Sequence, residues 1–317
     1  MVRAGADSCD WDQFDRPIGG VVDVCYASFA LGDSAKKSLE DTKAMLIDVV
    51  IHEIGHILGI RSKDLPFYYD RLTGLPRTPR PVKPDSNIDC INGKNSSEME
   101  GNIYRPSTST LKFGAMYPGI KYYEVVTPTV KRVARNHFNC PTMEGLRLEN
   151  QPNGDDCFGN HWEERLAWDS NMSAKLTPSS VPEVLSPFTL ALLEDSGWYK
   201  ANFSMSKNPS FGHGAGCDFV NKPCIVDDTP TSPQFCNTTD KRIVKCDPVR
   251  YFMTEKIYSL QKWVIFLIVS FTILFQTHRM MATCNLYDLS VETGQSYPPI
   301  PQVYRYFSNP VSDMDFL

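Results

Sequence analysis

The segment HEIGHILGI at residues 52–60 constrains the fold most, because it places His52 and His56 four residues apart with Glu53 between them. On a helix, residues four apart lie on one face, so both imidazoles can reach the same metal ion. Two neutral imidazoles leave Zn²⁺ open for a third ligand and a water. Glu53 points about 100° round the helix from His52, away from the ligand face, but it can still take a proton from that water. This H-E-x-x-H arrangement is typical of zinc peptidases.

The motif lies in an expected helix over residues 37–58, a stretch with no proline and with no glycine before Gly55. One set of side chains follows helical spacing, namely Met45, Val49, His52 and His56. The plain alternative is a solvated helix whose histidines bind nothing. Two histidines and a glutamate in an apolar run are costly to bury without a metal or partners, which favours the metal site. Gly59 then lets the helix end and the chain turn sharply.

The third ligand decides the class of zinc site. The compact metzincin pattern would place a third histidine at position 62, where this chain has Ser62. Neither Glu163 nor Glu164 stands in the Glu-x-x-x-Asp setting of a glutamate ligand, because no aspartate follows four residues later. The remaining candidates are His137, His161, His213 and His278.

His161 is the best of these candidates, and it lies in the segment GNHWEERLAWDSNMSA at 159–174. Met172 follows eleven residues later, and metzincins have a Met-containing turn beneath the zinc site. Taken alone, Met172 reads more simply as a core methionine. We expect His137 to be a partly exposed histidine in a loop or at a helix end. His213, in a Gly-rich loop, stays open as a weaker candidate ligand.

These segments resemble the leishmanolysin family of zinc metallopeptidases, which includes the invadolysins. That family keeps H-E-x-x-H-x-x-G and inserts a long segment before the third histidine, which here would be residues 60–160. The resemblance extends over most of the chain. It rests on DRPIGGVVDVC (15–25), HEIGHILGI (52–60), ARNHFNCPTMEGLRLEN (134–150), GNHWEERLAWDSNMSA (159–174), LALLEDSGWYKANFS (190–204), GAGCDFVNKPC (214–224), ATCNLYDL (282–289) and PPIPQVYRYFSN (298–309).

The resemblance implies an α+β fold: a metzincin-like zincin catalytic domain with a long insertion between the second and third zinc ligands, plus a Cys-rich C-terminal module. It implies three ligands for one Zn²⁺ per chain, His52, His56 and His161. It also implies that Glu53 is the catalytic base, that Met172 is the Met-turn residue and that Cys140 pairs with Cys217. The implied activity is proteolytic, in an enzyme that is often secreted or held at the cell surface.

The composition agrees with a secreted enzyme. The 317 residues allow two or three domains with cores, and a net charge of −5 without a basic run argues against nucleic acid as a partner. Ten cysteines suit disulfides, and none forms a C-x₂-C pair. Sequons typical of a glycoprotein stand at Asn95, Asn171, Asn202 and Asn237. Asn171 lies beside the expected Met turn and is not expected to carry a sugar.

The N-terminus departs from that family. The opening MVRAGADSCDWDQ lacks the apolar region of a signal peptide, and the residues before His52 leave room for one clear strand, at 19–31. We therefore expect an incomplete chain that is poorly soluble and weakly active or inactive. Its sheet would have too few strands, and apolar surface would be exposed around Ile47, Val50 or Ile54.

A second departure is the apolar run WVIFLIVSFTILF at 263–275, which looks foreign to the family pattern. Three interpretations stay open: a family-foreign insert, a buried strand or helix, and a membrane anchor. A membrane-spanning helix needs about 20 apolar residues, and this run is shorter.

Three regions follow from these features. Residues 1–61 would be the remnant of an N-terminal catalytic subdomain that ends in the active-site helix. Residues 62–222 would be the central and C-terminal catalytic subdomain with the third ligand and Met turn, opening with a Pro-rich surface loop at 63–87. Residues 223–317 would be the Cys-rich C-terminal module. Within the central region, SPFTLALLEDSGWY at 186–199 predicts a helix with Ser186 as N-cap and Gly197 as its stop.

The sequence thus predicts a zinc-dependent metalloendopeptidase that hydrolyses peptide bonds by a metal-activated water, with Glu53 as general base. Its expected partners are protein or peptide substrates, and a membrane surface is compatible with the resemblance. The alternative is a non-catalytic cell-surface or adhesion protein that retains the zinc motif. Cleavage of a denatured protein, with and without a chelator, separates the two.

Overall fold

The computed structural model describes residues 4–25, 39–117, 120–150, 157–174, 184–209, 211–227, 229–232, 234–235, 244–247 and 280–283. Its helices are α2 (Leu39–Ile57), α3 (Pro128–Phe138), α4 (Glu164–Ala167), α5 (Pro187–Asp195) and α6 (Gly216–Asn221). Its strands are β1 (Ala4–Trp11), β2 (Pro17–Val24), β3 (Leu111–Tyr117), β4 (Ile120–Val125), β5 (Leu146–Arg147), β6 (Ile225–Val226), β7 (Thr229–Pro230), β8 (Val244–Asp247) and β9 (Met280–Thr283). Short 3₁₀ turns cover Leu65–Phe67, Ser96–Glu98 and Phe203–Met205. Helices and antiparallel sheets together agree with the predicted α+β class.

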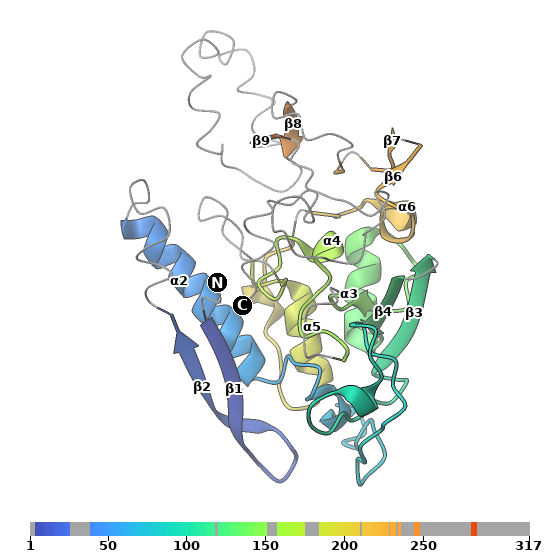
Figure 1. Ribbon diagram of the computed structural model, residues 1–317. Helices are drawn as coiled ribbons and strands as arrows, with labels where there is room; N and C mark the ends of the chain where they lie inside the picture. The colour runs from blue at the N-terminus through green and yellow to red at the C-terminus, as the bar shows by residue number, and fades with distance from the viewer. Residues whose placement is uncertain are drawn as a thin grey trace.

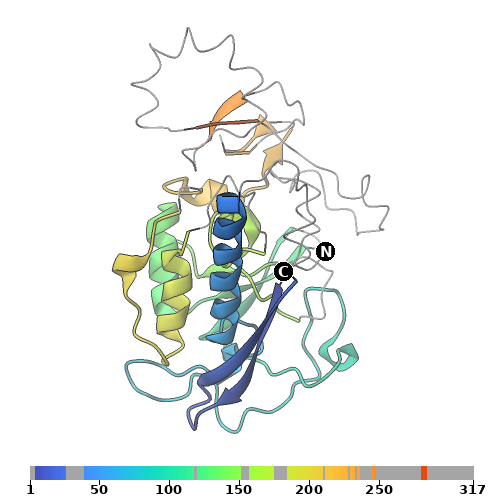
Figure 2. The same cartoon turned by 90° about the vertical axis from the view of Figure 1, so that its left-hand side faces the viewer.

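The N-terminal hairpin packs against α2, and the two strands lie beside that helix in both views (Figure 1, Figure 2). β1 and β2 pair antiparallel, with Ala4 opposite Val24 and an irregular register next to Ser8. Gly20 allows the close approach, because a Cβ atom at that position would lie 2.5 Å from Ile57 Cγ2. The hairpin therefore rests on the last turn of α2, next to the histidines of the motif.

This hairpin corrects the prediction of a single strand at 19–31. The strand found there, β2, begins earlier, and β1 comes before it; residues 26–31 lie outside the described residues. The sequence of β1, AGADSCDW, contains no β-branched residue, so its strand signal is weak. The expected apolar exposure is confirmed, since Ile47 and Ile54 of α2 are 58% and 43% exposed.

The main hydrophobic core joins α3, α5 and α6 through stacked aromatic rings. Phe138 of α3 stacks on Phe188 of α5 and on Phe219 of α6, with ring centroids 5.9 Å apart in both pairs. Phe219 also stacks on Phe235 at 5.1 Å. Aromatic rings bury large apolar areas and prefer defined geometries, so this stack fixes how the helices lie together.

Helix α5 agrees with its prediction. Ser186 is the N-cap, and its Oγ accepts a hydrogen bond from the Thr189 N–H at 3.4 Å. Pro187 occupies the first turn, and Gly197 follows the helix with a φ of +78°. A proline at the start and a glycine just past the end are the expected signals for a helix of this length.

The Pro-rich segment at 63–87 is partly a surface loop and partly core, which corrects the prediction. Leu72 and Leu75 are 83% and 64% exposed, as a surface loop requires. Leu65 and Tyr68, however, are 2% and 0% exposed. The start of the segment therefore belongs to the core, and the Tyr68 hydroxyl donates to the Gly59 carbonyl just after α2.

Two disulfides connect distant parts of the chain. Cys140 pairs with Cys217, which confirms the pairing that the family resemblance implied. Cys90 pairs with Cys157, a link that the sequence did not assign. Both bridges close loops of more than sixty residues, with sequence separations of 77 and 67.

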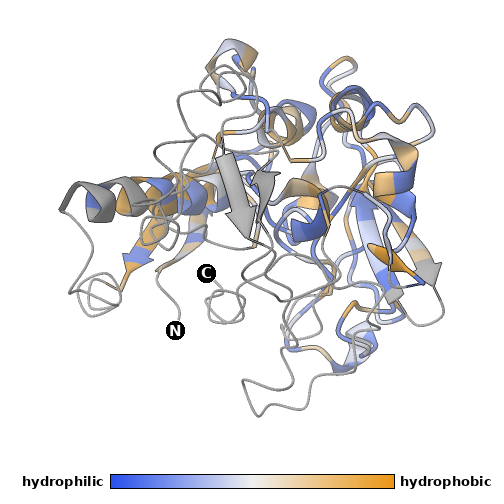
Figure 3. Cartoon of the chain, turned by 90° about the horizontal axis from the view of Figure 1, so that it is seen from above, coloured by the Kyte–Doolittle hydropathy of each residue, from blue (hydrophilic) through white to orange (hydrophobic). Residues whose placement is uncertain are grey.

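The described helices carry alternating hydrophobic and hydrophilic stretches (Figure 3). Among the residues that the structure describes, none of the helices has the length and apolar character needed to cross a membrane. The apolar run at 263–275 lies outside the described residues.

Candidate metal centre

Three buried histidines come together from two distant parts of the chain. His52 and His56 lie one turn apart on α2, while His161 comes from the segment before α4. The Nε2 atom of His56 lies 3.0 Å from Nε2 of His52 and 3.2 Å from Nε2 of His161. All three residues are less than a tenth exposed, and in the described part of the chain they form a cluster that could hold a metal ion.

The hydrogen bonds of the outer ring nitrogens fix the tautomers. His52 Nδ1 donates to the Asn171 carbonyl at 2.6 Å, and His56 Nδ1 donates to the Ile60 carbonyl at 2.8 Å. A carbonyl oxygen can only accept, so the proton of each neutral ring is on Nδ1. The Nε2 lone pairs of His52 and His56 are therefore free of protons, and Nε2 of His161 lies beside them.

This donor set fits a zinc ion. Neutral imidazole nitrogen is a preferred ligand of Zn²⁺, and a tetrahedral ion with Zn–N bonds of about 2.0–2.1 Å holds its nitrogens about 3.3 Å apart. The observed separations of 3.0 and 3.2 Å are close to that value. Lone pairs that face each other at this distance repel, so a cation between them relieves an unfavourable arrangement.

Burial keeps the imidazoles of His52 and His56 neutral. It lowers the pKa of His52 well below its ordinary value, and the neighbouring rings of His56 and His161 lower it further. Burial likewise lowers the pKa of His56 to about 3, with His161 as the next cause. A neutral imidazole is the form that binds a metal ion, so these rings can bind one at neutral pH without first losing a proton.

Glu53 lies next to His52 on the helix and is 1% exposed. Its Oε1 is buried and has no hydrogen-bond partner within the described residues. Burial raises the pKa of Glu53 to about 7, and the nearby His161 opposes this shift. A buried carboxylate oxygen without a protein partner can accept a proton from a bound molecule.

Met172 lies against the same turn of α2. It is completely buried, and a Cβ atom at Gly55 would stand 2.6 Å from its Sδ. The missing side chain of Gly55, between the two motif histidines, thus makes room for the thioether. The neighbouring residue Asn171 supplies the acceptor for His52, and its side chain accepts from Thr189 Oγ1 at 3.0 Å.

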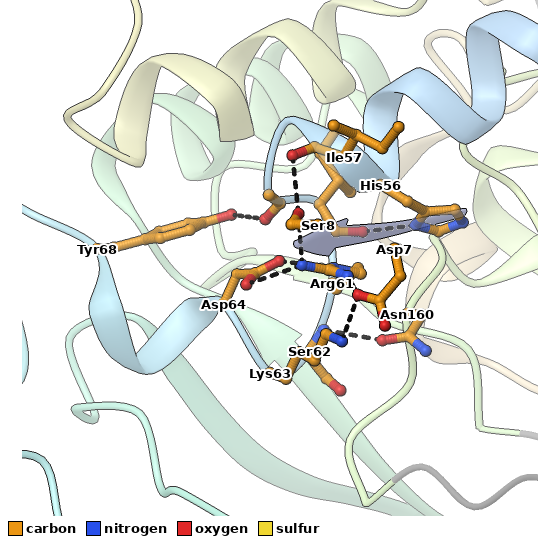
Figure 4. A network of polar contacts seen from close by, with 12 residues as sticks. Asp7, Ser8, His56, Ile57, Arg61, Ser62, Lys63, Asp64, Tyr68 and Asn160 are labelled. Carbon is orange, nitrogen blue, oxygen red and sulfur yellow. Dashed lines mark hydrogen bonds and ion pairs between the residues drawn. The ribbon is translucent and has the colours of Figure 1, made fainter. Parts of the chain in front are cut away.

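The turn after α2 supports His56 (Figure 4). Gly59 ends the helix with a φ of +104°, and its carbonyl accepts from the Tyr68 hydroxyl at 2.8 Å. Ile60 then presents the carbonyl that holds His56. One residue further, the Ser62 N–H donates to Asn160 Oδ1 at 2.8 Å, which links this turn to the residue before His161.

A charged network ties the same turn to β1 (Figure 4). The buried Arg61 donates to Asp64 at 2.8 Å and to Ser8 Oγ at 2.7 Å, and it also pairs with Asp7. Lys63 donates to Asp7 at 2.7 Å as well. Because Asp7 and Ser8 belong to β1 while Asp64 belongs to the turn itself, Arg61 fixes the position of the turn relative to the hairpin.

The other candidate residues lie elsewhere. His137, in the last turn of α3, is 6% exposed, which corrects the expectation of a partly exposed ring. His213 is exposed, and His278 lies outside the described residues. Glu163 and Glu164 are buried at the start of α4 and are not in the histidine cluster.

Sequence reasoning missed Glu149. Its Oε1 accepts from His161 Nδ1 at 2.7 Å and from the Asn160 N–H at 2.9 Å. Burial alone would raise the pKa of this carboxyl, but His161 and these hydrogen bonds hold it below its ordinary value. A glutamate twelve residues before a histidine follows no period, so no pattern in the sequence indicates the contact.

Comparisons with known proteins point to one family. The family model described as leishmanolysin matches residues 118–313, a range that includes His161 and Met172. The chain is similar to the leishmanolysin-like peptidases of Drosophila melanogaster (36% identical over 213 residues) and Caenorhabditis elegans (33% over 215). It is also similar to the leishmanolysin of Leishmania major (26% over 243). These matches cover 66%, 67% and 76% of this chain, and 29%, 30% and 32% of the relatives, so the chain spans about three tenths of their length.

Proposed function

The chain belongs to the leishmanolysin family, as the sequence resemblance predicted, and from this membership we propose that it is a zinc-dependent metalloendopeptidase acting on peptide bonds in proteins. One observation carries the proposal. Three buried imidazoles bring their Nε2 atoms together, next to a carboxylate oxygen with no hydrogen-bond partner among the described residues. A structural cluster of histidines would satisfy its ring nitrogens with protein groups instead.

The ligands of the proposed site are His52, His56 and His161, which would hold one Zn²⁺ per chain. When bound, the ion would lower the pKa of a water ligand and polarise the carbonyl of a substrate. Backbone carbonyls orient two of the rings, and Glu149 orients the third. Gly59 and Met172 support the site by shaping the turn and by filling the space beneath α2.

Glu53 is the proposed general base. It follows His52 directly on α2 and is not one of the three proposed ligands. Its Oε1 has no hydrogen-bond partner among the described residues and is available to a bound molecule. In this role it would accept a proton as the attack on the peptide carbonyl begins. It would then pass that proton to the nitrogen of the leaving amine.

The finer fold assignment is also part of the proposal. We propose a zincin-like catalytic domain whose long insertion, residues 60–160, separates the second and third ligands. The three regions 1–61, 62–222 and 223–317 would then be an N-terminal catalytic subdomain, a second catalytic subdomain and a Cys-rich module. Protein or peptide substrates follow from the activity, and nucleic acid does not fit the net charge of −5.

A secreted or cell-surface location, with contact to a membrane surface, is proposed on three grounds. They are the family, the two disulfides and the sequons. Asn202 is exposed and can carry a sugar, whereas Asn171 is 4% exposed and cannot. The alternative function, a non-catalytic adhesion protein that retains the zinc motif, shares this location but lacks proteolysis.

Substitution of the general base tests the proposal. Glu53→Gln should reduce cleavage of denatured casein by at least about 10²-fold, because a general base contributes that much. Zinc content, measured by atomic absorption, should stay at the native level because Glu53 is not a ligand. His56→Ala should lose both zinc and activity. Glu100→Gln, on an exposed loop, is the matched control and should behave as the native chain.

A chelator should abolish native cleavage, and added Zn²⁺ should restore it. Full activity of Glu53→Gln would exclude Glu53 from the mechanism. A native chain that binds zinc but cleaves nothing would favour the adhesion protein.

A further inference from the structure

Glu149 is a carboxylate that contacts a ring of the histidine cluster directly. His52 and His56 donate to backbone carbonyls, which are uncharged, but His161 Nδ1 donates to Glu149 Oε1 at 2.7 Å. The side chains of Glu149 and His161 are 13% and 10% exposed. A hydrogen bond to an ionised acceptor is roughly twice as strong as one between neutral groups, so this contact holds its ring most firmly.

The backbone on either side of Glu149 forms hydrogen bonds with the segment that carries His161. The Glu149 N–H donates to the His161 carbonyl at 2.9 Å, and the Glu163 N–H donates to the Arg147 carbonyl at 2.9 Å. Leu148 and Trp162 form an antiparallel bridge between these bonds. The segment that carries His161 is therefore attached to the end of β5 by main-chain bonds as well as by the carboxylate.

Gly159 leaves room for the Glu149 side chain because it has no side chain of its own. Its φ is +89°, and a Cβ atom there would lie 2.9 Å from Glu149 Cγ and still closer to the Glu149 carbonyl oxygen. The Asn160 N–H then donates to the same Oε1 at 2.9 Å. The turn of residues 159–161 thus wraps around the Glu149 side chain, and two successive residues of the turn bind it.

His161 needs such support more than the other two rings. His52 and His56 are fixed by α2, whereas His161 lies in an irregular segment and reaches the cluster from 105 residues away. A carboxylate partner fixes the tautomer and the orientation of a ligating ring, and it raises the basicity of the nitrogen that faces the metal.

We propose that Glu149 is a positioning residue for the metal centre, which holds His161 with its Nε2 lone pair toward His52 and His56. This inference rests on the proposed zinc site. Loss of such a partner lowers metal affinity about 10- to 100-fold. A purely structural Glu149, which only joins two segments, would instead affect the stability of the metal-free chain and leave metal affinity unchanged.

The test uses the full chain and compares Glu149→Gln and Glu149→Ala with the native protein. Glutamine keeps the volume and an acceptor oxygen but removes the charge, and alanine removes both. The control is Glu144→Gln, five residues earlier, whose side chain is 51% exposed and forms surface ion pairs of little energetic weight. The zinc dissociation constant is measured by competition with a chromophoric chelator, and unfolding of the metal-free chain is followed in urea.

We expect Glu149→Gln to bind zinc about tenfold more weakly and Glu149→Ala up to about 100-fold more weakly, while Glu144→Gln stays within about twofold. The visible spectrum of the Co²⁺-substituted chain should change in the two Glu149 variants and not in the control. If Glu149→Ala does not fold, Glu149→Gln decides alone.

Zinc affinity of the Glu149 variants within about twofold of native would overturn the positioning role and leave the zinc site standing. A native chain that binds no zinc would overturn the zinc site itself, and the positioning role with it. The native measurement therefore separates a failure of this inference from a failure of the proposed function.

Discussion

His137 shows how burial sets the behaviour of a single side chain. Its Nε2 donates to the Phe211 carbonyl at 2.9 Å, and its ring packs on Phe138 and Phe188 with centroids 4.6 and 4.9 Å away. Burial lowers its pKa to about 4; the bond to Phe211 opposes this shift, and the nearby His213 adds to it. In the unfolded chain the pKa of a histidine is about 6.5.

Folding stability should therefore depend on pH through His137. Between about pH 6.5 and pH 4 the unfolded chain binds this proton and the folded chain does not, so stability falls as pH falls through that window. The loss attributable to His137 is at most about 3 kcal/mol, from 1.36 kcal/mol per pKa unit. His137→Gln keeps a donor for Phe211 but does not titrate. Urea unfolding at pH 7.5, 6 and 5 should show a steeper decline for the native chain, and parallel profiles would contradict the prediction.

The sequence predicted those residues of the candidate site that lie close together along the chain, and it missed a residue whose contact depends on distant segments. His52, Glu53 and His56 stand within five positions, so their spacing is visible in one helix turn. His161 was chosen from the remaining histidines by the Met172 that follows it, and the family resemblance then implied the same residue, because its distance from the motif follows no fixed number. Glu149 was not found, since its contact depends on the bridge between β5 and the later segment. The burial of His137 was missed for the same reason, because the covering residue Phe211 is far along the chain.

At the level of elements, the contact between β2 and α2 sets how closely the hairpin packs against the last turn of the motif helix. A Cβ at Gly20 would lie 2.5 and 2.8 Å from Ile57 side-chain atoms and 2.9 Å from the Asp7 carbonyl oxygen. Ser8 Oγ donates to the Ile57 carbonyl at 3.1 Å, so the same spot also joins β1 to the helix. Helix periodicity predicted α2 to within two residues at each end, while β1 lacked any strong strand signal.

Gly20→Ala should push the hairpin away from α2 and lower stability by about 1–3 kcal/mol, the usual cost of overpacking. Gly5→Ala is the matched control, because Gly5 lies in the same hairpin and a Cβ there meets nothing within 4 Å. That control should change stability by less than about 0.5 kcal/mol. Urea unfolding midpoints measure both variants. Equal midpoints for Gly20→Ala and Gly5→Ala would show that the hairpin does not rest on Gly20.

Across the whole molecule, the disulfides connect segments that the regular elements do not. Cys140 follows α3 and Cys217 lies in α6, beside the aromatic stack. Cys90 and Cys157 join the irregular segment before β3 to the segment that carries His161. Much of the chain between residues 60 and 160 has little regular structure, so these covalent links restrict it where helices and strands do not.

Removal of one link should destabilise the fold strongly. Cys140→Ala with Cys217→Ala opens a loop of 77 residues, and the chain-entropy estimate for such a loop is about 4.5 kcal/mol. Thermal unfolding under non-reducing conditions should show a clearly lower midpoint. Cys9→Ala is the control, because Cys9 is exposed and forms no disulfide among the described residues. An unchanged midpoint in the double variant would mean that non-covalent contacts already restrict this loop.

The large separation of His56 and His161 along the sequence affects how a bound metal would stabilise the fold. A metal held by both residues would act as a reversible cross-link over 105 positions, one whose strength is set by concentration. By mass action, a ligand that binds the folded chain at 100 times its dissociation constant adds about 2.7 kcal/mol to stability. The supply of metal in the surroundings would then govern how long the protein survives, as well as whether it works.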